Sequence, residues 1–249
     1  MAGHSHWAGI KHKKGKADKQ RSKLFSKLSR EITVAAKLGL PDIEFNPRLR
    51  SAVQAAREAN MPKDNITRAI KKSQGPNEDS NYEKSQYEGF GPGGVAFIVE
   101  ALTDNKNRTV TNLRSLFEKN NASLGVEGSV SYQFEEVGHI KIKKELISEE
   151  AIFAQALEAG AEDCTSGEEH HEIFCKKENF NEVRTSIETK VKDLSFSGII
   201  WKPKNTVSIN KEIFEKIITF IDLLEDDEDV QNVYTNFDVD ENVLKELEL

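Results

Sequence analysis

Cysteine and long apolar runs are scarce in this sequence. Only Cys164 and Cys175 occur in 249 residues, so no disulfide framework supports the fold, and we expect a reducing, cytoplasmic location. No apolar stretch approaches the roughly 20 residues that a membrane-spanning helix needs, so we expect no membrane partner. Residues 1–30 lack the apolar centre of a secretory signal. Their basic, acid-poor composition also occurs in transit peptides, although Trp7 and residues 9–12 fit an ordered segment at least as well.

Signatures of known catalytic sites are also missing. The chain has no G-x-S-x-G elbow, no H-E-x-x-H helix and no cysteine in a triad-like setting. Asp104, Asn105 and Arg108 cluster at a predicted strand-to-helix turn and could form a polar site, but helix capping and a loop salt bridge are the favoured explanation. We therefore predict that the protein is not an enzyme, with no catalytic residues and no cofactor.

Four side chains in the second half of the chain could hold a zinc ion. Cys164, His170, His171 and Cys175 fall on or beside two short predicted strands, where alternation directs adjacent side chains to opposite faces. His170 and His171 therefore cannot easily both point inward, and we predict no metal site. His4, His6 and His12 form a looser set, which suits phosphate contacts better than a metal.

A glycine-rich segment, residues 89–94, resembles a phosphate-binding loop only superficially. It precedes a predicted strand, contains Pro92 and lacks the Lys-Ser/Thr ending of a P-loop. The segment is better explained as a structural turn. Because glycines also fit closely against a partner's backbone, contact with a partner stays open for Gly89, Gly91, Gly93 and Gly94.

Charge is strongly segregated along the chain. Residues 1–75 contain 17 Lys and Arg against 6 Asp and Glu, whereas the remaining 174 residues contain 18 against 36. The protein as a whole carries a formal net charge of −7. A basic segment inside an acidic protein is typical of binding to a polyanion, because uncompensated like charges destabilise a fold unless a partner relieves them.

The periodicity predicts an α+β fold that begins with three helices. A helix over residues 17–38 separates cations from apolar side chains, a second begins at Pro47 with Asn46 as its N-cap, and a third ends at residues 71–72. Residues 73–85 are predicted to be a linker, so the basic helical domain spans residues 1–75.

Beyond the linker the pattern predicts two ferredoxin-like β-α-β-β-α-β domains, one inserted in the other. The inserted domain spans residues 136–203, and the outer domain comprises residues 86–135 plus 204–249. The outer elements are predicted as strand 95–102, helix 109–120, strand 129–134, strand 205–209, helix 210–225 and strand 230–237.

Four long segments resemble the YebC/PmpR family. They are MAGHSHWAGIKHKKGKADKQRSKLFSKLSREI, NPRLRSAVQAAREANMPKDNITRAIKK, YEGFGPGGVAFIVEALTDNKNRTV and SLGVEGSVSYQF, and the resemblance covers essentially the whole chain. It implies the same three-domain architecture and no catalysis. Members are usually described as cytoplasmic DNA-binding transcriptional regulators. Others associate with the ribosome and relieve stalled synthesis, and one activates mitochondrial translation.

Two functional hypotheses follow. The first is a nucleic-acid-binding regulator of transcription that places its basic helices on DNA phosphates. The alternative is a translation factor that binds ribosomal RNA, which the lack of a recognisable base-reading element or dimer seam favours. The oligomeric state is not predicted beyond a slight preference for a monomer. The expected nucleic-acid contacts are the same in both cases: Lys11, Lys13, Lys14, Lys16, Lys19, Lys23, Lys27, Arg30, Arg48, Arg50, Arg68, Lys71 and Lys72.

Overall fold

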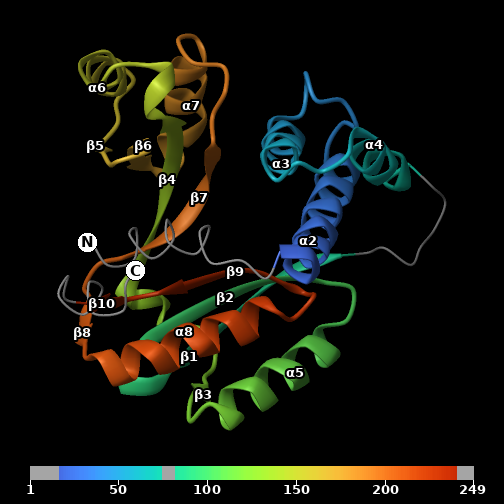
Figure 1. The fold of residues 1–249 in the computed structure, drawn as a ribbon, viewed down its shortest axis with the longest axis vertical. Coiled ribbons are helices and arrows are strands. Elements are labelled where there is room, and N and C mark those ends of the chain that lie inside the picture. The colour runs from blue at the N-terminus through green and yellow to red at the C-terminus, as the bar shows by residue number, and fades with distance from the viewer. Residues whose placement is uncertain (1–16, 75–81, 240–249) are drawn as a thin grey trace. The chain divides into compact units, whose positions relative to one another are not determined.

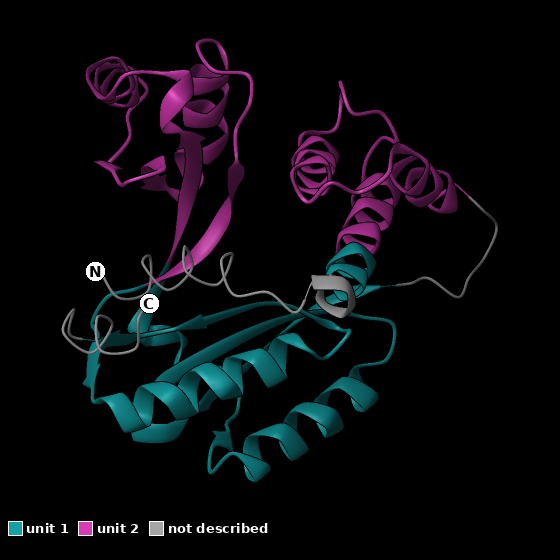
Figure 2. Ribbon diagram, in the orientation of Figure 1, with its two compact units in different colours: residues 1–27, 77–135, 203–249 teal, residues 28–76, 136–202 magenta. Residues whose placement is uncertain are grey.

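The computed structural model describes residues 17–74 and 82–239 (Figure 1). The chain divides into two compact units (Figure 2). Unit 1 comprises residues 1–27, 77–135 and 203–249, and unit 2 comprises residues 28–76 and 136–202. The three-domain division expected from the sequence stays a prediction. Within the described residues, no helix is long and apolar enough to cross a membrane.

Three helices open the described chain, as the periodicity predicts. They are α2 (Ala17–Leu38), α3 (Pro47–Glu58) and α4 (Lys63–Lys72). Ile32, Ala35, Leu49 and Val53 are buried at helical spacing, so one face of α2 packs against α3. The hydroxyl of Thr33 donates to the carbonyl of Ala69 at 3.0 Å, which attaches α4 to α2.

The side chain of Asn46 fixes the connection between α2 and α3. Its Oδ1 accepts from the backbone N–H of Leu49 at 3.0 Å, which caps α3. Its Nδ2 donates to the carbonyls of Ala35 at 2.8 Å and Leu40 at 2.7 Å. Asn46 is only 6% exposed, so the loss of these bonds would leave buried polar groups without a partner.

The inserted sheet has the ferredoxin-like strand order β5-β6-β4-β7. Its elements, in chain order, are β4 (Phe134–Lys143), α6 (Glu149–Glu158), β5 (Asp163–Ser166), β6 (His170–Lys176), α7 (Phe180–Glu188) and β7 (Phe196–Pro203). Ile140, Ile173, Val183 and Ile187 belong to one buried cluster, which places α7 over the sheet face that carries the two isoleucines. The succession of elements predicted for residues 136–203 is confirmed.

The outer sheet has the order β3-β1-β2-β9, and one of its strands was not predicted. The strands are β1 (Glu83–Phe90), β2 (Ala96–Thr103), β3 (Ser123–Leu124) and β9 (Val230–Thr235), and the helices are α5 (Lys106–Lys119) and α8 (Lys211–Glu225). Figure 1 shows both helices on the same face of this sheet. Phe97 of β2, Phe117 of α5 and Phe220 of α8 meet there, with ring centroids 4.9 to 6.3 Å apart.

Two strand predictions for the outer sheet are wrong. Residues 205–209 were predicted to be a strand of this sheet, but the strand between β3 and β2 is β1, which lies partly inside the segment predicted to be a linker. Residues 205–209 contain β8 (Val207–Ile209), which pairs in parallel with β10 (Phe237–Val239) in a separate two-stranded sheet. Residues 129–134 are also not a strand of this sheet. They contain a short 3-10 turn, and β3 lies earlier, at residues 123–124.

A buried carboxylate explains why residues 128–131 do not pair as a strand. Glu88 of β1 is 2% exposed and accepts from the backbone N–H groups of Gly128 at 3.0 Å, Val130 at 2.8 Å and Ser131 at 2.8 Å. Burial alone would raise the pKa of Glu88, but these backbone hydrogen bonds outweigh it and lower the pKa. The N–H groups that a strand would use are therefore bound to one side chain.

The inserted sheet also contains a carboxylate, that of Glu172, which is partly buried. Glu172 of β6 contacts His139 Nε2 at 2.9 Å and Lys141 Nζ at 3.2 Å. Burial would raise the pKa of Glu172, but its interactions with His139 and Lys141 lower it from 4.5 to about 2. Burial in turn lowers the pKa of His139, whose ring stacks on Phe174 at 4.6 Å.

We predict that Asn46→Ala lowers the free energy of unfolding by about 2 to 4 kcal/mol, because the helix loses its cap and two carbonyls lose a donor. Urea unfolding followed by circular dichroism measures the change. Asn65→Ala, at a helical position whose side chain makes no hydrogen bond among the described residues, is the matched control and should change stability far less. Equal effects of the two substitutions would contradict the role of Asn46.

Glu172→Gln should destabilise the protein in a pH-dependent way. A carboxylate with a lowered pKa stabilises the fold fully above pH 4.5, and this contribution disappears as the pH falls from about 4.5 towards 2. The difference in unfolding free energy between wild type and variant should therefore reach about 2 to 3 kcal/mol near neutral pH and shrink on acidification. Urea titrations at several pH values measure it, with the exposed Glu158→Gln as control. A difference that is independent of pH would refute the ionic contribution.

Candidate nucleic-acid interface

Two predicted phosphate contacts on α2 are engaged within the protein. Lys23 Nζ lies 2.8 Å from an oxygen of Asp226, and Lys27 Nζ donates to the carbonyl of Glu225 at 2.6 Å. Glu225 is the last residue of α8, where cations are favoured because the helix dipole and unpaired carbonyls present negative charge. The acidic segment at residues 225–229 therefore neutralises part of the basic helix.

Two predicted contacts on α3 are also paired. Arg48 binds both carboxylate oxygens of Glu31, at 2.7 and 3.1 Å. Arg50 donates to the carbonyls of Ile43 and Glu44, and its Nη1 lies 3.4 Å from an oxygen of Glu188. The bidentate pair holds the guanidinium of Arg48 in a fixed geometry, and two carbonyls hold that of Arg50. Both arginines therefore contribute first to the architecture of unit 2.

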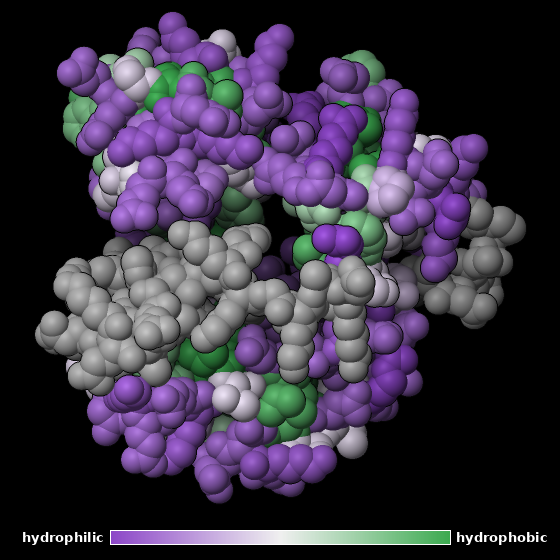
Figure 3. All heavy atoms as spheres, viewed as in Figure 1, coloured by the Kyte–Doolittle hydropathy of each residue, from purple (hydrophilic) through white to green (hydrophobic). Residues whose placement is uncertain are grey.

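The exposed face of α4 is different. Arg68, Lys71 and Lys72 are exposed, and among the described residues no ion pair or side-chain hydrogen bond joins them to another group. At 100° per residue the three fall within about 100° of one another, opposite the buried Ile66 and Ala69. Figure 3 draws the surface around α4 largely in hydrophilic colours. These three cations on one face of a helix form the candidate interface.

The remaining predicted contacts are only partly described. Lys11, Lys13, Lys14 and Lys16 lie outside the described residues, as do the side chain of Lys19 and the histidines at positions 4, 6 and 12. Arg30 is half-buried on α2. Two further exposed cations, Arg57 at the end of α3 and Lys63 at the start of α4, likewise have no ion pair among the described residues.

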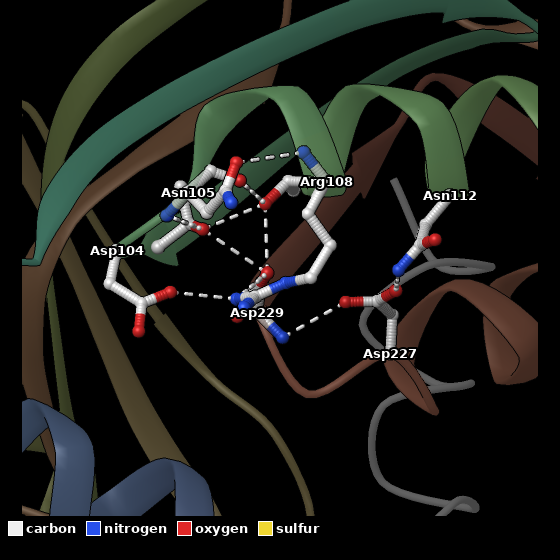
Figure 4. Close-up of polar contacts among 8 residues, drawn as sticks. Asp104, Asn105, Arg108, Asn112, Asp227 and Asp229 are labelled. Atoms are coloured by element: carbon white, nitrogen blue, oxygen red, sulfur yellow. Dashed lines mark hydrogen bonds and ion pairs between the residues drawn. The ribbon is translucent and has the colours of Figure 1, made fainter.

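The polar cluster at the start of α5 has a structural role (Figure 4). Asp229 is 3% exposed, and its carboxylate accepts from Thr109 at 2.8 Å, Thr103 at 3.2 Å and Arg108 at 2.9 Å. Asn105 caps α5 by accepting from the N–H of Arg108 at 3.1 Å. The cluster therefore attaches α5 to the segment before β9, as the capping and salt-bridge explanation predicts.

The glycine-rich turn is split between core and surface. Gly89 and Gly91 are buried. A Cβ added to Gly89 would lie 2.5 Å from the carbonyl oxygen of Ser123, and one added to Gly91 would lie 2.3 Å from the ring of Phe97. Gly93 and Gly94 are exposed, with φ of 72° and 74°. Of the four glycines considered for partner contact, only these two face solvent.

The four candidate zinc ligands lie on β5 and β6 of the inserted sheet. His171 is fully buried, with Nδ1 2.7 Å from the hydroxyl of Ser166 and Nε2 3.0 Å from the carbonyl of Ile147. Cys175 is buried and Cys164 is half-buried. In the part of the chain that the structure describes, no three His, Cys, Asp or Glu side chains are grouped to hold a metal ion.

Comparisons with known proteins define the class of this architecture. Residues 5–76 match the family model for the TACO1/YebC protein N-terminal domain, and residues 82–237 match the model for the TACO1/YebC second and third domain. The chain therefore belongs to the TACO1/YebC family, and the resemblance found in its motifs is confirmed.

Two relatives give the similarity in more detail. The chain is 54% identical over 242 residues to a protein of Pelagibacter ubique (strain HTCC1062) named "Probable transcriptional regulatory protein", covering 97% of this chain and all of the relative. The crystal structure of a conserved hypothetical protein from Aquifex aeolicus matches with a TM-score of 0.83 at 48% identity, covering 94% of this chain and 97% of that one. The predicted α+β fold class is thereby confirmed.

We predict that Asp229→Asn lowers the free energy of unfolding by about 2 kcal/mol, because hydrogen bonds to a buried charged group are removed. Asp104→Asn is the matched control, since Asp104 pairs with the same guanidinium at 2.8 Å but its side chain is 37% exposed. Its substitution should cost below about 1 kcal/mol. Chemical denaturation compares the two variants, and a larger cost at Asp104 would contradict the assignment.

Proposed function

We propose that this protein is a non-enzymatic, nucleic-acid-binding regulator that docks through the exposed cations of α4. The observation that carries the proposal is the contrast between neighbouring helices. Lys23, Lys27, Arg48 and Arg50 are engaged within the protein, whereas Arg68, Lys71 and Lys72 of α4 have no such partner among the described residues. Lysine and arginine side chains that are not neutralised internally remain available to displace counterions from a phosphate backbone.

Duplex DNA is the first candidate target. The name of the Pelagibacter ubique relative points to transcription, and the connection between α3 and α4 supports it. Only residues 59–62 separate the two helices, and Asn60 adopts a left-handed conformation with φ of 59°. Helix-turn-helix units have a turn of this length, and their second helix, here α4, enters the major groove.

Structured RNA is the second candidate. The observation that favours it is that the cations Arg68, Lys71 and Lys72 position a protein on phosphates without reading a sequence. The same exposed side of α4 also carries Asp64 and Thr67. Recognition of RNA by shape needs no more than this. A translation factor would use the same face on ribosomal RNA.

The triple substitution Arg68→Glu, Lys71→Glu and Lys72→Glu should weaken binding at least tenfold at moderate salt. On duplex DNA, the slope of log K against log salt should decrease by about 0.9 for each phosphate that the variant no longer neutralises. Fluorescence anisotropy with labelled duplex DNA and a structured RNA of equal length measures both quantities.

The matched control is Arg114→Glu, Lys119→Glu and Lys192→Glu, which changes the net charge equally at exposed positions outside the helical segment. An equal loss of affinity in both variants would mean that overall charge, not α4, governs binding. Tighter binding to one DNA sequence than to random DNA by about 10³ or more would indicate a transcriptional regulator. Preference for RNA would indicate the translational role, and no binding to either would refute the proposal.

A further inference from the structure

A surface at one end of the outer sheet has the chemistry of a second nucleic-acid contact. It consists of the loop at residues 125–133, the exposed end of the glycine turn and Lys204, all of which belong to unit 1. Tyr132 is 66% exposed and Val126 is 79% exposed on this loop. An exposed aromatic ring on a fixed backbone is suited to binding, because aromatic rings supply contact area at little cost in conformational entropy.

The backbone that carries Tyr132 is held from both sides. Glu88 binds the N–H groups of Gly128, Val130 and Ser131, and its own carbonyl accepts from Gly125 at 2.7 Å. On the other side, the N–H of Lys204 donates to the carbonyl of Gln133 at 2.9 Å. The loop therefore presents its side chains in a pre-organised arrangement, which lowers the entropy cost of binding.

One buried asparagine brings the glycine turn to the same place. Asn236 is 1% exposed. Its Oδ1 accepts from the N–H of Ala96, just after the turn, at 2.8 Å, and its Nδ2 donates to the side chain of Gln133 at 3.0 Å. Its carbonyl accepts from Val207 at 2.8 Å, which anchors the segment after Lys204. Three segments that are distant in sequence thus converge at one end of the sheet.

The charge and the open space at this end of the outer sheet suit a bound nucleotide. Lys204 is exposed, and its Nζ donates one long hydrogen bond, of 3.3 Å, to the carbonyl of Tyr132. This bond places a cation beside the aromatic residue, and among the described residues no carboxylate neutralises it. Apart from Gly94 and its two chain neighbours, no atom of the described residues lies within 4 Å of the position that a Cβ on Gly94 would occupy, so a ligand backbone can approach closely there. An exposed ring with an adjacent cation is the combination that binds a base and its phosphate in single strands.

We infer that Tyr132 stacks on an unpaired base of a single-stranded nucleic-acid segment whose phosphate contacts Lys204, beside Gly93 and Gly94. This inference rests on the proposed function and adds to it a second contact of different specificity. The face on α4 binds phosphates of either duplex or single strands. The Tyr132 surface selects unpaired bases, because a base inside a duplex has no free face on which to stack.

The test compares two probes of equal length, a single-stranded RNA without self-complementarity and a duplex, by fluorescence anisotropy. Tyr132→Ala should weaken binding of the single strand by about 5- to 150-fold, the range expected for the removal of one base stack, and change duplex binding less than about twofold. Tyr132→Phe should keep wild-type affinity, because its ring can still stack. Lys204→Gln should weaken single-strand binding and reduce its salt slope by about 0.7.

Glu127→Gln is the matched control, since it alters the same loop without removing an aromatic group or a cation, and it should not weaken binding. Unchanged single-strand affinity in Tyr132→Ala, or a reduction in Tyr132→Phe as large as in Tyr132→Ala, would overturn the inference while leaving the role of α4 intact. Equal reductions on single strand and duplex would also overturn it. If wild type binds neither probe, the proposed function fails together with this inference.

Discussion

One buried carboxylate organises the loop beside the edge of the outer sheet. Glu88 lies in β1, between β2 and β3, and binds the backbone of the loop that leads from β3 towards β4. A carboxylate removed from water is costly unless donors surround it, and here three backbone N–H groups and the side chain of Gln86 provide them. The interaction ends strand pairing on that side, positions Tyr132 and fixes the path by which the chain enters the inserted segment.

Contacts within the fold also decide which cations are available at the surface, because several predicted phosphate contacts are paired with groups of the protein itself. The acidic residues at the end of α8 bind Lys23 and Lys27, and Glu31 binds Arg48. A basic segment therefore exposes a smaller cationic surface than its composition indicates. Asp64 is the single acidic residue of α4, whereas the helix carries four cations, so its net charge is positive. A candidate phosphate-binding face is therefore recognised by cations that have no partner within the protein, more than by the total charge of the segment.

Elements with strong local signals were predicted well. Asn46 and Pro47 mark the start of α3, and apolar spacing locates α2, α5 and α8. The strand β1 was missed because its sequence, EKSQYEGF, has no β-branched residue and few apolar ones. It is a strand because it forms a hairpin with the neighbouring β2 on one side and pairs with β3 on the other, where Gly89 lies opposite Leu124. Its pairing partners, more than its own residue types, determine its conformation. Residues 129–134 were predicted as a strand from local pattern alone, and a distant glutamate overrides that pattern.

The sequence by itself determined the α+β class, the three basic helices, the order of elements in residues 136–203 and the segregation of charge, because these follow from periodicity and composition along the chain. Only the tertiary structure decided which strand completes the outer sheet, which of the four glycines reach the surface and which of the described cations are paired. These properties depend on contacts between residues far apart in sequence, such as Lys23 with Asp226 and Asn236 with Ala96. No local pattern encodes these distant partners, since only the folded chain brings them together.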